Sequence, residues 1–404
     1  MHIPELVSPA GNWSSLKSAV SSGCDSVYFG VKGLNMRHGA GNFDLLEIKK
    51  IMKYLHDNSK KGYLALNVII YEKDLKLVKK ILLEAKKAQV DAVVLWDHAV
   101  LMMAKELGLN IHLSTQASVS NYEALKSYAS LGVKRVVLAR ECSLSDIKKI
   151  IKNKRKDALD CGIEIFIHGA MCVSVSGRCF MSELTFGKSA NRGECLQPCR
   201  REYKIIDMDS EAEYVLGEDY VLSPKDLCSV EIIDELIDAG IDAFKIEGRI
   251  RSSEYVKVVT KVYREAIDSH SNKTLDAKKK KDFKEELIQV YNRGFSKGFY
   301  EGKPAGWISK GMGHKKEKVY IIKKYFNKIE VAEILVQNTG LKINDEVIVT
   351  GDKTEAFVFK VNRIEKDHIK IKLAVKGEKV AVKVPGRVRA GDKIYKWVSV
   401  SHSE

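Results

Sequence analysis

Five cysteines crowded into one part of the sequence carry its clearest chemical signal. The chain has 404 residues and eight cysteines, and five of these fall within a stretch of 57 residues. Thiolates are soft ligands for zinc and iron–sulfur clusters, and in a reducing compartment such crowding favours metal binding over disulfides. The five are Cys172, Cys179, Cys195, Cys199 and Cys228, whereas Cys24, Cys142 and Cys161 are scattered in apolar or helical contexts typical of buried thiols.

The spacing of the five cysteines helps to distinguish between these two kinds of metal site. Consecutive members are separated by six, fifteen, three and twenty-eight residues. Zinc ribbons generally pair two short Cys-x2–4-Cys knuckles, so this long and uneven spacing favours an iron–sulfur cluster. Five cysteines for four ligand positions leave one over, and the alternative that all five are free thiols also stays open.

Eight short apolar runs alternate with amphipathic helices along the first 250 residues. The runs are rich in Val, Ile, Leu and Tyr and lack strict alternation, which is typical of parallel strands covered by helices. Eight such units favour a TIM-type (β/α)8 barrel, an α/β fold, over a doubly wound sheet. The runs are Glu5–Ser8, Ser26–Gly30, Leu64–Ile70, Ala92–Asp97, Ile111–Gln116, Arg135–Ala139, Glu164–His168 and Ala243–Glu247.

The connection after the seventh run is much longer than the others. It extends for about 70 residues from His168 to Phe244 and contains all five clustered cysteines. Loops of that length inside a compact domain are uncommon and usually functional. Because barrel active sites lie at the carboxyl ends of the strands, polar residues there are further candidates, although each alone could be a structural cap or an internal ion pair. They are Asn67, Gln116, Arg140, His168, Glu247 and Arg249.

The pattern changes near the C-terminus from helical periodicity to alternation with a period of two. Val380, Val382 and Val384 alternate with polar or small residues, and glycines mark turns between such runs. We therefore expect a (β/α) barrel over 1–270 with a cysteine-rich insertion at 169–242, a helical linker over 271–316, and a small antiparallel β-barrel over 317–404. That last module holds 18 basic and 12 acidic residues and is more plausible as an RNA-binding arm than as a catalytic unit.

The composition indicates a soluble protein with a basic surface. No apolar run approaches the roughly 18 to 20 residues of a membrane span, and the N-terminal residues lack the pattern of a signal peptide. We expect a cytoplasmic location and no membrane partner. The formal net charge of +15 favours a polyanionic partner such as RNA, although a solvated, lysine-rich surface would give the same value.

The cysteine-rich segment resembles the defining pattern of the peptidase U32 family. In that pattern a strand ending in glycine, here Gly169, is followed by Cys172 and then by Gly177-Arg178-Cys179. Similarity extends over nearly the whole predicted barrel. It includes Glu5–Asn12, Ala19–Gly30, Asn35–Arg37, Ser114–Gln116, Arg140–Glu141 and Phe244–Arg249.

The resemblance implies a cofactor and a reaction. Family members that hydroxylate RNA or ubiquinone precursors without molecular oxygen carry a [4Fe–4S] cluster on such cysteines. Matching positions implies Cys172, Cys179, Cys195 and Cys228 as ligands, with Cys199 as the alternative to Cys228. The implied activity is oxygen-independent hydroxylation of tRNA, at the wobble uridine, or of rRNA, with prephenate as a co-substrate and a second U32 subunit as a candidate partner.

Two other functions stay open beside RNA hydroxylation. The family name implies a collagenase-like peptidase, but the sequence has no His-Glu-x-x-His helix and no Gly-x-Ser-x-Gly elbow. A non-catalytic RNA-binding accessory protein is the second alternative.

For a hydroxylase we expect roles for eight side chains near the strand ends. The candidates for catalysis are His168 and Glu247, placed for proton transfer, together with Asn67 and Gln116. The candidates for binding a phosphate or a carboxylate are Arg37, Arg178, Lys245 and Arg249.

Overall fold

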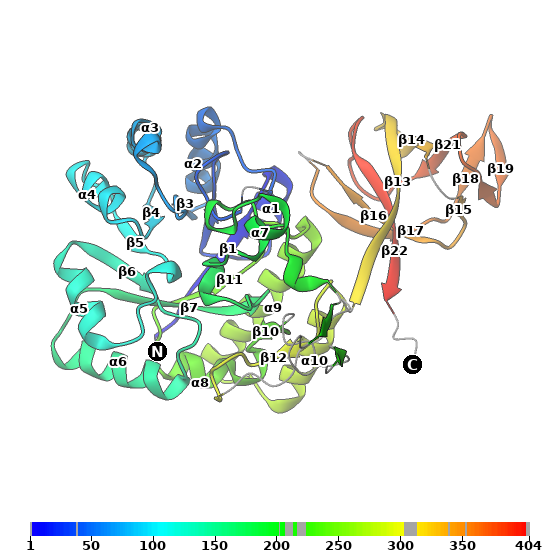
Figure 1. The fold of residues 1–404 in the computed structure, drawn as a ribbon. Coiled ribbons are helices and arrows are strands. Elements are labelled where there is room, and N and C mark those ends of the chain that lie inside the picture. Colours follow the sequence, from blue (N-terminus) through cyan, green and yellow to red (C-terminus); the bar gives the residue numbers. More distant parts are fainter. Residues whose placement is uncertain are drawn as a thin grey trace.

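Eight parallel strands close into a barrel, which confirms the predicted fold class. The computed structural model describes residues 2–37, 39–201, 203–206, 213–215, 224–302, 313–337, 340–351 and 354–400. The strands follow chain order around the barrel, and β11 closes it by pairing with both β1 and β7 (Figure 1). They are β1 (Glu5–Ala10), β2 (Ser26–Phe29), β3 (Lys61–Ala65), β4 (Ala92–Leu95), β5 (Ile111–Leu113), β6 (Val133–Val137), β7 (Gly162–Gly169) and β11 (Ala243–Ile246).

The third strand lies earlier in the sequence than expected. The apolar run predicted a strand over Leu64–Ile70, whereas β3 ends at Ala65. Leu66 and Val68 are buried although they follow the strand, so the apolar run continues into the loop at the barrel mouth. Apolar character alone does not separate a buried strand from the buried loop after it.

Amphipathic helices cover the outside of the barrel. Helix α6 is typical, because Leu144, Ile147 and Ile151 are buried on one face and the Ser143 hydroxyl accepts a hydrogen bond from the Asp146 amide at 3.2 Å. The helices are α1 (Trp13–Ser21), α2 (Ile48–Asp57), α3 (Leu75–Lys87), α4 (His98–Glu106), α5 (Tyr122–Ser130), α6 (Leu144–Lys156), α8 (Ile233–Asp238), α9 (Ser253–Ser271) and α10 (Ala277–Ile288).

The insertion after β7 is built from short elements that lie over the carboxyl ends of the strands. It contains helix α7 (Met181–Phe186), three single 3-10 turns and the hairpin of β8 (Lys204–Ile206) and β9 (Glu213–Val215). It ends in β10 (Asp226–Cys228), which pairs antiparallel with the end of β7 and parallel with β12 (Phe295–Ser296). The insertion is fastened to the barrel mouth, because the Ile69 amide donates to the Asn191 carbonyl at 3.2 Å.

The C-terminal module is a curled antiparallel sheet with its own apolar core. Eight of its strands form one sheet in the order β17-β16-β22-β13-β14-β21-β18-β19, and Val380, Val382 and Val384 are buried as the alternation predicted. The strands are β13 (Gly313–Phe326), β14 (Val331–Val336), β15 (Leu341–Lys342), β16 (Glu346–Thr350), β17 (Phe357–Lys360), β18 (Ile364–Lys366), β19 (Ile369–Ile371), β20 (Leu373–Ala374), β21 (Lys379–Lys383) and β22 (Lys393–Val400).

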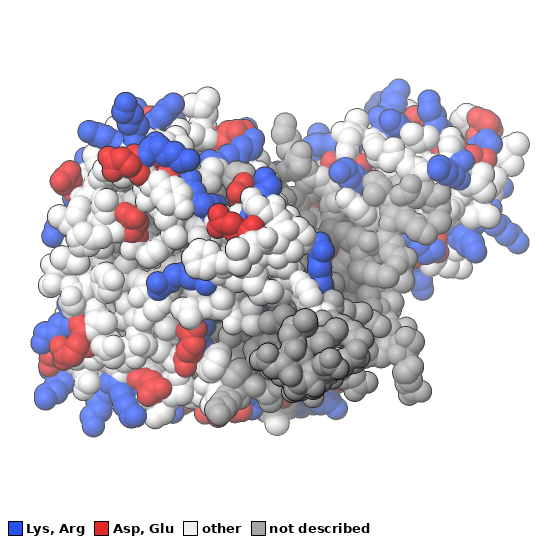
Figure 2. All heavy atoms as spheres, viewed as in Figure 1, with Lys and Arg blue, Asp and Glu red and all other residues white. Residues whose placement is uncertain are grey.

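The module contacts the barrel at the helices α1 and α9. The Ser14 hydroxyl donates to the Thr354 carbonyl at 2.8 Å, and Lys257 pairs with Glu355 at 2.8 Å. On the face of the barrel seen in Figure 2, basic and acidic side chains are intermixed, whereas basic side chains predominate on the module. No helix in the described ranges has the length and apolarity needed to cross a bilayer.

Candidate functional site

A cavity of about 400 Å³ lies at the carboxyl ends of the barrel strands, below the insertion. Residues from the strand ends form its floor, and residues of the insertion form its wall. Three other hollows among the described residues, of about 710, 470 and 460 Å³, are larger, but none of the predicted site residues lines them. The chemistry of the lining therefore selects the cavity at the barrel mouth as the candidate site.

Four thiols line this cavity. They belong to Cys172, Cys179, Cys195 and Cys199, all in the insertion. Burial raises the pKa of the Cys199 thiol; Arg200 opposes the shift, and the charges of the other three thiols add to it. The four sulfur atoms are thus electrostatic neighbours that share one cavity.

Local backbone geometry positions these thiols. The Cys179 sulfur accepts a hydrogen bond from the Met181 amide and the Cys195 sulfur accepts one from the Gln197 amide, both at 3.4 Å. Gly193 has a φ of +84°, and a Cβ there would lie 2.1 Å from the Asn35 carbonyl oxygen. Only glycine allows this close approach, which brings the segment before Cys195 against the barrel mouth.

Cys228, which matching to the family implied as the fourth ligand, does not line the cavity. It is buried at the end of β10, and its sulfur accepts a hydrogen bond from the Tyr263 hydroxyl at 3.9 Å. Burial raises its pKa to about 11, and the charges that act on it belong to Lys284 and Glu231 rather than to the other cysteines. The structure therefore groups Cys199, the alternative ligand, with the three others.

The floor of the cavity carries several cationic groups and one carboxylate. Glu247 pairs with Arg37 at 3.0 Å. Burial opposes ionisation of Glu247, but Arg37, Arg249 and Arg140 outweigh it and lower the pKa of this carboxyl. Burial also lowers the pKa of Arg249 to about 10, which still leaves the group cationic at neutral pH. The site is thus positively charged around an ionised Glu247.

Two of these guanidinium groups have nitrogen atoms without a partner. Arg140 donates to the Ala170 carbonyl at 2.8 Å and stacks on the Phe166 ring at 4.3 Å, while its Nε and Nη2 are buried and find no acceptor among the described residues. Arg249 donates to Asn35 at 3.1 Å, and its Nε likewise finds none there. Buried donors without acceptors are rare and indicate an anionic or water ligand.

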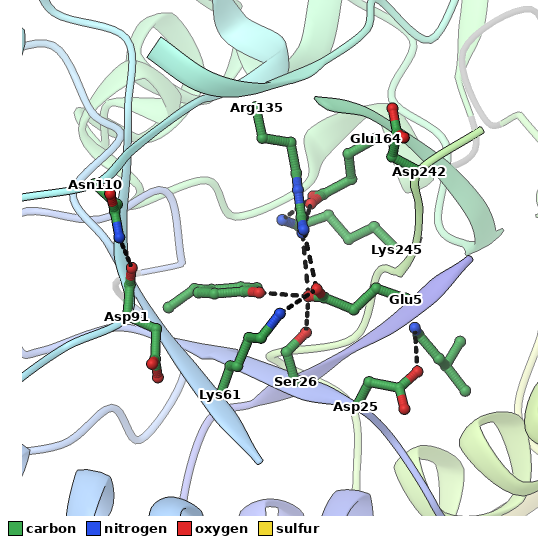
Figure 3. A network of polar contacts seen from close by, with 12 residues as sticks. Glu5, Asp25, Ser26, Lys61, Asp91, Asn110, Arg135, Glu164, Asp242 and Lys245 are labelled. Carbon is green, nitrogen blue, oxygen red and sulfur yellow. Dashed lines mark hydrogen bonds and ion pairs between the residues drawn. The ribbon is translucent and has the colours of Figure 1, made fainter. Parts of the chain in front are cut away.

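Lys245 reaches the same floor from inside the barrel. Its ammonium group pairs with Glu164 at 2.6 Å and lies 4.3 Å from the centre of the Tyr28 ring. Glu164 also pairs with Arg135, which pairs in turn with Glu5 at 2.9 Å, so a chain of charges extends down the barrel interior (Figure 3). The sequence did not indicate this network, because four charged residues in four separate strands give no sign that they meet.

Asn67 and Gln116, both expected at the site, meet on the cavity wall. The Asn67 amide donates to the Ser114 hydroxyl at 3.3 Å and to the Gln116 side chain at 3.4 Å. Gln116 in turn donates to the Ser176 carbonyl in the insertion at 3.2 Å. These amides connect the barrel rim to the cysteine-rich segment.

His168 and Arg178 are not brought to the cavity lining. His168 is buried among Tyr255, Tyr263 and Phe295, and burial lowers its pKa to about 3. Arg178 lies outside the wall, where it donates to the Ser118 hydroxyl at 2.9 Å. The cavity contains instead Tyr28 and Phe166, for which position within the second and seventh strands was the only sequence signal.

The fold and the site together define a class, a (β/α)8 barrel whose strand-end cavity is covered by a thiol-rich insertion. The chain belongs to peptidase family U32, whose family model matches residues 11–308.

Its relatives carry names for two different activities. The chain is 44% identical to an uncharacterized protease of Methanocaldococcus jannaschii over 98% of both chains, and 40% identical to a collagenase of Porphyromonas gingivalis over 97% of both. It is 34% identical to tRNA hydroxylation protein P1 of Bacillus subtilis, over 89% of this chain and 86% of that protein. Family membership therefore leaves hydrolysis and RNA hydroxylation as the two candidate reactions.

Proposed function

We propose that the protein is an iron–sulfur enzyme that hydroxylates a base of RNA without molecular oxygen. The observation that carries the proposal is the convergence of Cys172, Cys179, Cys195 and Cys199 on one cavity. The kinship to a tRNA hydroxylation protein supports it. The substrate would be tRNA, at the wobble uridine, or rRNA. We propose with it a cytoplasmic location and a second U32 subunit as a candidate partner.

The donor set fits a [4Fe–4S] cluster. Such clusters take four cysteine thiolates, and hydrogen bonds from backbone amides to the sulfur atoms tune their potential, as the Met181 and Gln197 amides would do here. Among the described residues no three His, Cys, Asp or Glu side chains are grouped closely enough to hold a single metal ion. When bound, the cluster would supply one-electron transfer next to the cavity.

The cationic floor suits a small carboxylate co-substrate, for which we propose prephenate. The donors without acceptors on Arg140 and Arg249, with Lys245 beside them, would bind carboxylate oxygens at the bottom of the cavity. The Tyr28 and Phe166 rings would contact the apolar part of the molecule. Desolvation in this enclosed position strengthens each of these ionic contacts.

The polar wall is suited to hold and orient a base above that floor. A target nucleotide would be turned out of its stack into the cavity, as enzymes that modify bases require. Asn67 and Gln116 are held by their mutual hydrogen bond and can face the polar edge of the base. Glu247, kept ionised by its arginine neighbours, is the carboxylate available to accept a proton.

The ligand set can be tested through iron content. We expect anaerobically purified protein to contain about four irons and four sulfides per chain. Cys199→Ala should lose most of this iron, whereas Cys228→Ala should retain it. Cys161→Ala, which changes another buried thiol, is the matched control. Iron that is lost from Cys228→Ala and kept by Cys199→Ala would refute the proposed ligand set.

The reaction can be tested by mass spectrometry of nucleosides from a strain that lacks this protein. We expect one hydroxylated pyrimidine to disappear from tRNA or rRNA and to return with the wild-type chain but not with Cys172→Ala. An unchanged modification profile would refute the proposed reaction.

Hydrolysis is the second candidate function, because a relative named a collagenase matches the chain over nearly its full length. Against it, no histidine lines the cavity among the described residues, and thiols held as cluster ligands would not be available as nucleophiles. Colourless, chelator-treated protein that cleaves casein would favour this function.

A further inference from the structure

Three large apolar side chains of the insertion are exposed beside the cavity mouth. Phe180 is 68% exposed, Leu184 is 85% exposed and Leu196 is 56% exposed. Phe180 and Leu184 flank Met181 and Ser182, which line the cavity. The Leu196 amide donates to the Ser182 hydroxyl at 3.0 Å, so the two parts of this surface are joined. Clusters of exposed apolar side chains usually mark a binding surface.

The surroundings of these side chains are cationic. The segment 172–201 contains five basic and two acidic residues. Arg178 lies over the Trp96 ring at 5.4 Å and Arg201 over the Phe186 ring at 4.5 Å. Neither these two arginines nor Lys188 makes an ion pair with a carboxylate of the described residues. The surface thus combines apolar faces with three cations that make no ion pair among the described residues.

We propose that this surface binds the single-stranded nucleotides that flank the reacting base of an RNA loop. We call it the insertion ledge, made of Phe180, Leu184 and Leu196 with the cations Arg178, Lys188 and Arg201. The proposal rests on the proposed function and names the part of the chain that holds the substrate.

The chemistry of the ledge matches unpaired RNA. Bases that are unstacked present their faces to aromatic rings and to guanidinium planes, while the phosphates seek cations. A duplex keeps its base faces inside the stack, so it cannot use Phe180 in this way. A protein partner would have to bury Arg178, Lys188 and Arg201 in an apolar contact, which is costly without acidic partners.

The ledge lies where the nucleotides next to a turned-out base would be. A base turned into the cavity keeps its neighbours on the strand only one backbone repeat away, and the ledge borders the same opening. Phe180 is therefore placed to stack on an adjacent base and to replace the stacking that the turned-out base gives up.

Binding of a labelled oligouridylate of ten nucleotides to the anaerobic holoprotein tests the proposal. Phe180→Ala should weaken binding about 5- to 150-fold, as expected for the loss of one stacked base. Phe180→Trp should retain wild-type affinity or bind more tightly. Ile3→Ala, which removes a 54% exposed side chain just before β1 at the other end of the barrel, should have no effect. A ten-base-pair RNA duplex should bind all four proteins equally.

Salt dependence separates stacking from charge. Arg201→Gln should lower the slope of log affinity against log salt by about 0.7, the value for one phosphate contact on a single strand. Phe180→Ala should leave the slope unchanged, because it removes no charge.

Equal affinity of wild type and Phe180→Ala for the oligouridylate would overturn the proposal. A dimer seen by light scattering for the wild type and lost in Phe180→Ala would also overturn it, because the ledge would then contact protein. Iron content shows that each variant keeps its cluster site. If the strain lacking this protein loses a modified nucleoside but Phe180→Ala binds the oligouridylate as tightly as the wild type, only the ledge proposal is refuted. If Phe180→Ala weakens binding but the strain lacking this protein loses no modified nucleoside, only the proposed function is refuted.

Discussion

Replacing Glu164 by glutamine should reveal how strongly the buried charge chain stabilises the barrel. Glu164 is fully buried and pairs with Lys245 at 2.6 Å and with Arg135 at 3.2 Å (Figure 3). Glutamine has nearly the same shape but no charge. Arg135 keeps Glu5 as a partner at 2.9 Å, whereas Lys245 is left without an anion.

The size of the effect follows from that asymmetry. Removing one partner of a buried ion pair costs about 3–5 kcal/mol, because the other charge stays desolvated. The Tyr28 ring, 4.3 Å from the Lys245 ammonium, contacts it in both proteins and so leaves this difference unchanged. Because the glutamine carbonyl can still accept a hydrogen bond from Lys245, we expect Glu164→Gln to lower the free energy of unfolding by about 3 kcal/mol, the lower end of this range.

Urea unfolding followed by circular dichroism measures this change, and a double substitution tests its cause. Glu164→Gln combined with Lys245→Met removes both charges, so it should be more stable than Glu164→Gln alone. Lys149→Met, which breaks an exposed pair with Asp146 at 3.7 Å, should change stability by less than about 0.5 kcal/mol.

The pH dependence of the same difference has a definite sign. Burial opposes ionisation of Glu164, but Lys245 and Arg135 outweigh it and lower the pKa of the carboxyl. A carboxyl with a lowered pKa stabilises the fold above its unfolded pKa of about 4.3 and loses that contribution as pH falls through its folded pKa. The wild-type advantage should therefore be constant above about pH 5 and shrink below pH 4.3. A cost below about 1 kcal/mol at pH 7, or a double variant less stable than Glu164→Gln, would refute the reasoning.

Two further predictions concern His168 and Gly193. Burial lowers the pKa of His168 to about 3 in the folded protein, whereas in the unfolded chain it is about 6.5, so protonation favours unfolding. Between pH 7.5 and 5.5, the free energy of unfolding of the wild type, measured in urea, should therefore fall by about 1.4 kcal/mol more than that of His168→Phe. Gly193→Ala should destabilise the insertion by at least about 1 kcal/mol more than Gly187→Ala, measured by the rate of limited proteolysis, because both positions have positive φ but only Gly193 lies against a carbonyl oxygen. Equal slopes with pH, or equal proteolysis rates, would contradict these two predictions.

The barrel was predictable because its strands are apolar runs and amphipathic helices lie between them. These local patterns can be recognised in the sequence, because strands buried on both sides contain few polar residues. The network of Glu5, Arg135, Glu164 and Lys245 was not predictable, because its members lie in four different strands and meet only when the barrel closes.

The position of His168 away from the cavity has a specific structural cause. Along β7, Glu164 and Phe166 face the barrel interior, and strict alternation would direct His168 there too. The pairing with β11 shifts register between Lys245 and Ile246, where Phe166 and His168 are the partners. This irregularity turns His168 outward against Tyr255 and Tyr263 of α9. A single extra residue in a strand therefore moved a predicted catalytic group from the cavity to the outer core.

The choice between Cys199 and Cys228 as the fourth ligand also depended on how the strands pair. Spacing along the chain identified the cysteine-rich segment, but it could not show that β10 folds back antiparallel onto β7. That pairing places Cys228 opposite His168, below the rim, while the turn at Pro198–Arg200 holds Cys199 at the cavity wall. The cationic side chains near that wall follow from the fold in the same way, since a net charge of +15 says nothing about where the charges gather. The substrate surface is therefore to be sought on the insertion rather than inferred from the overall charge.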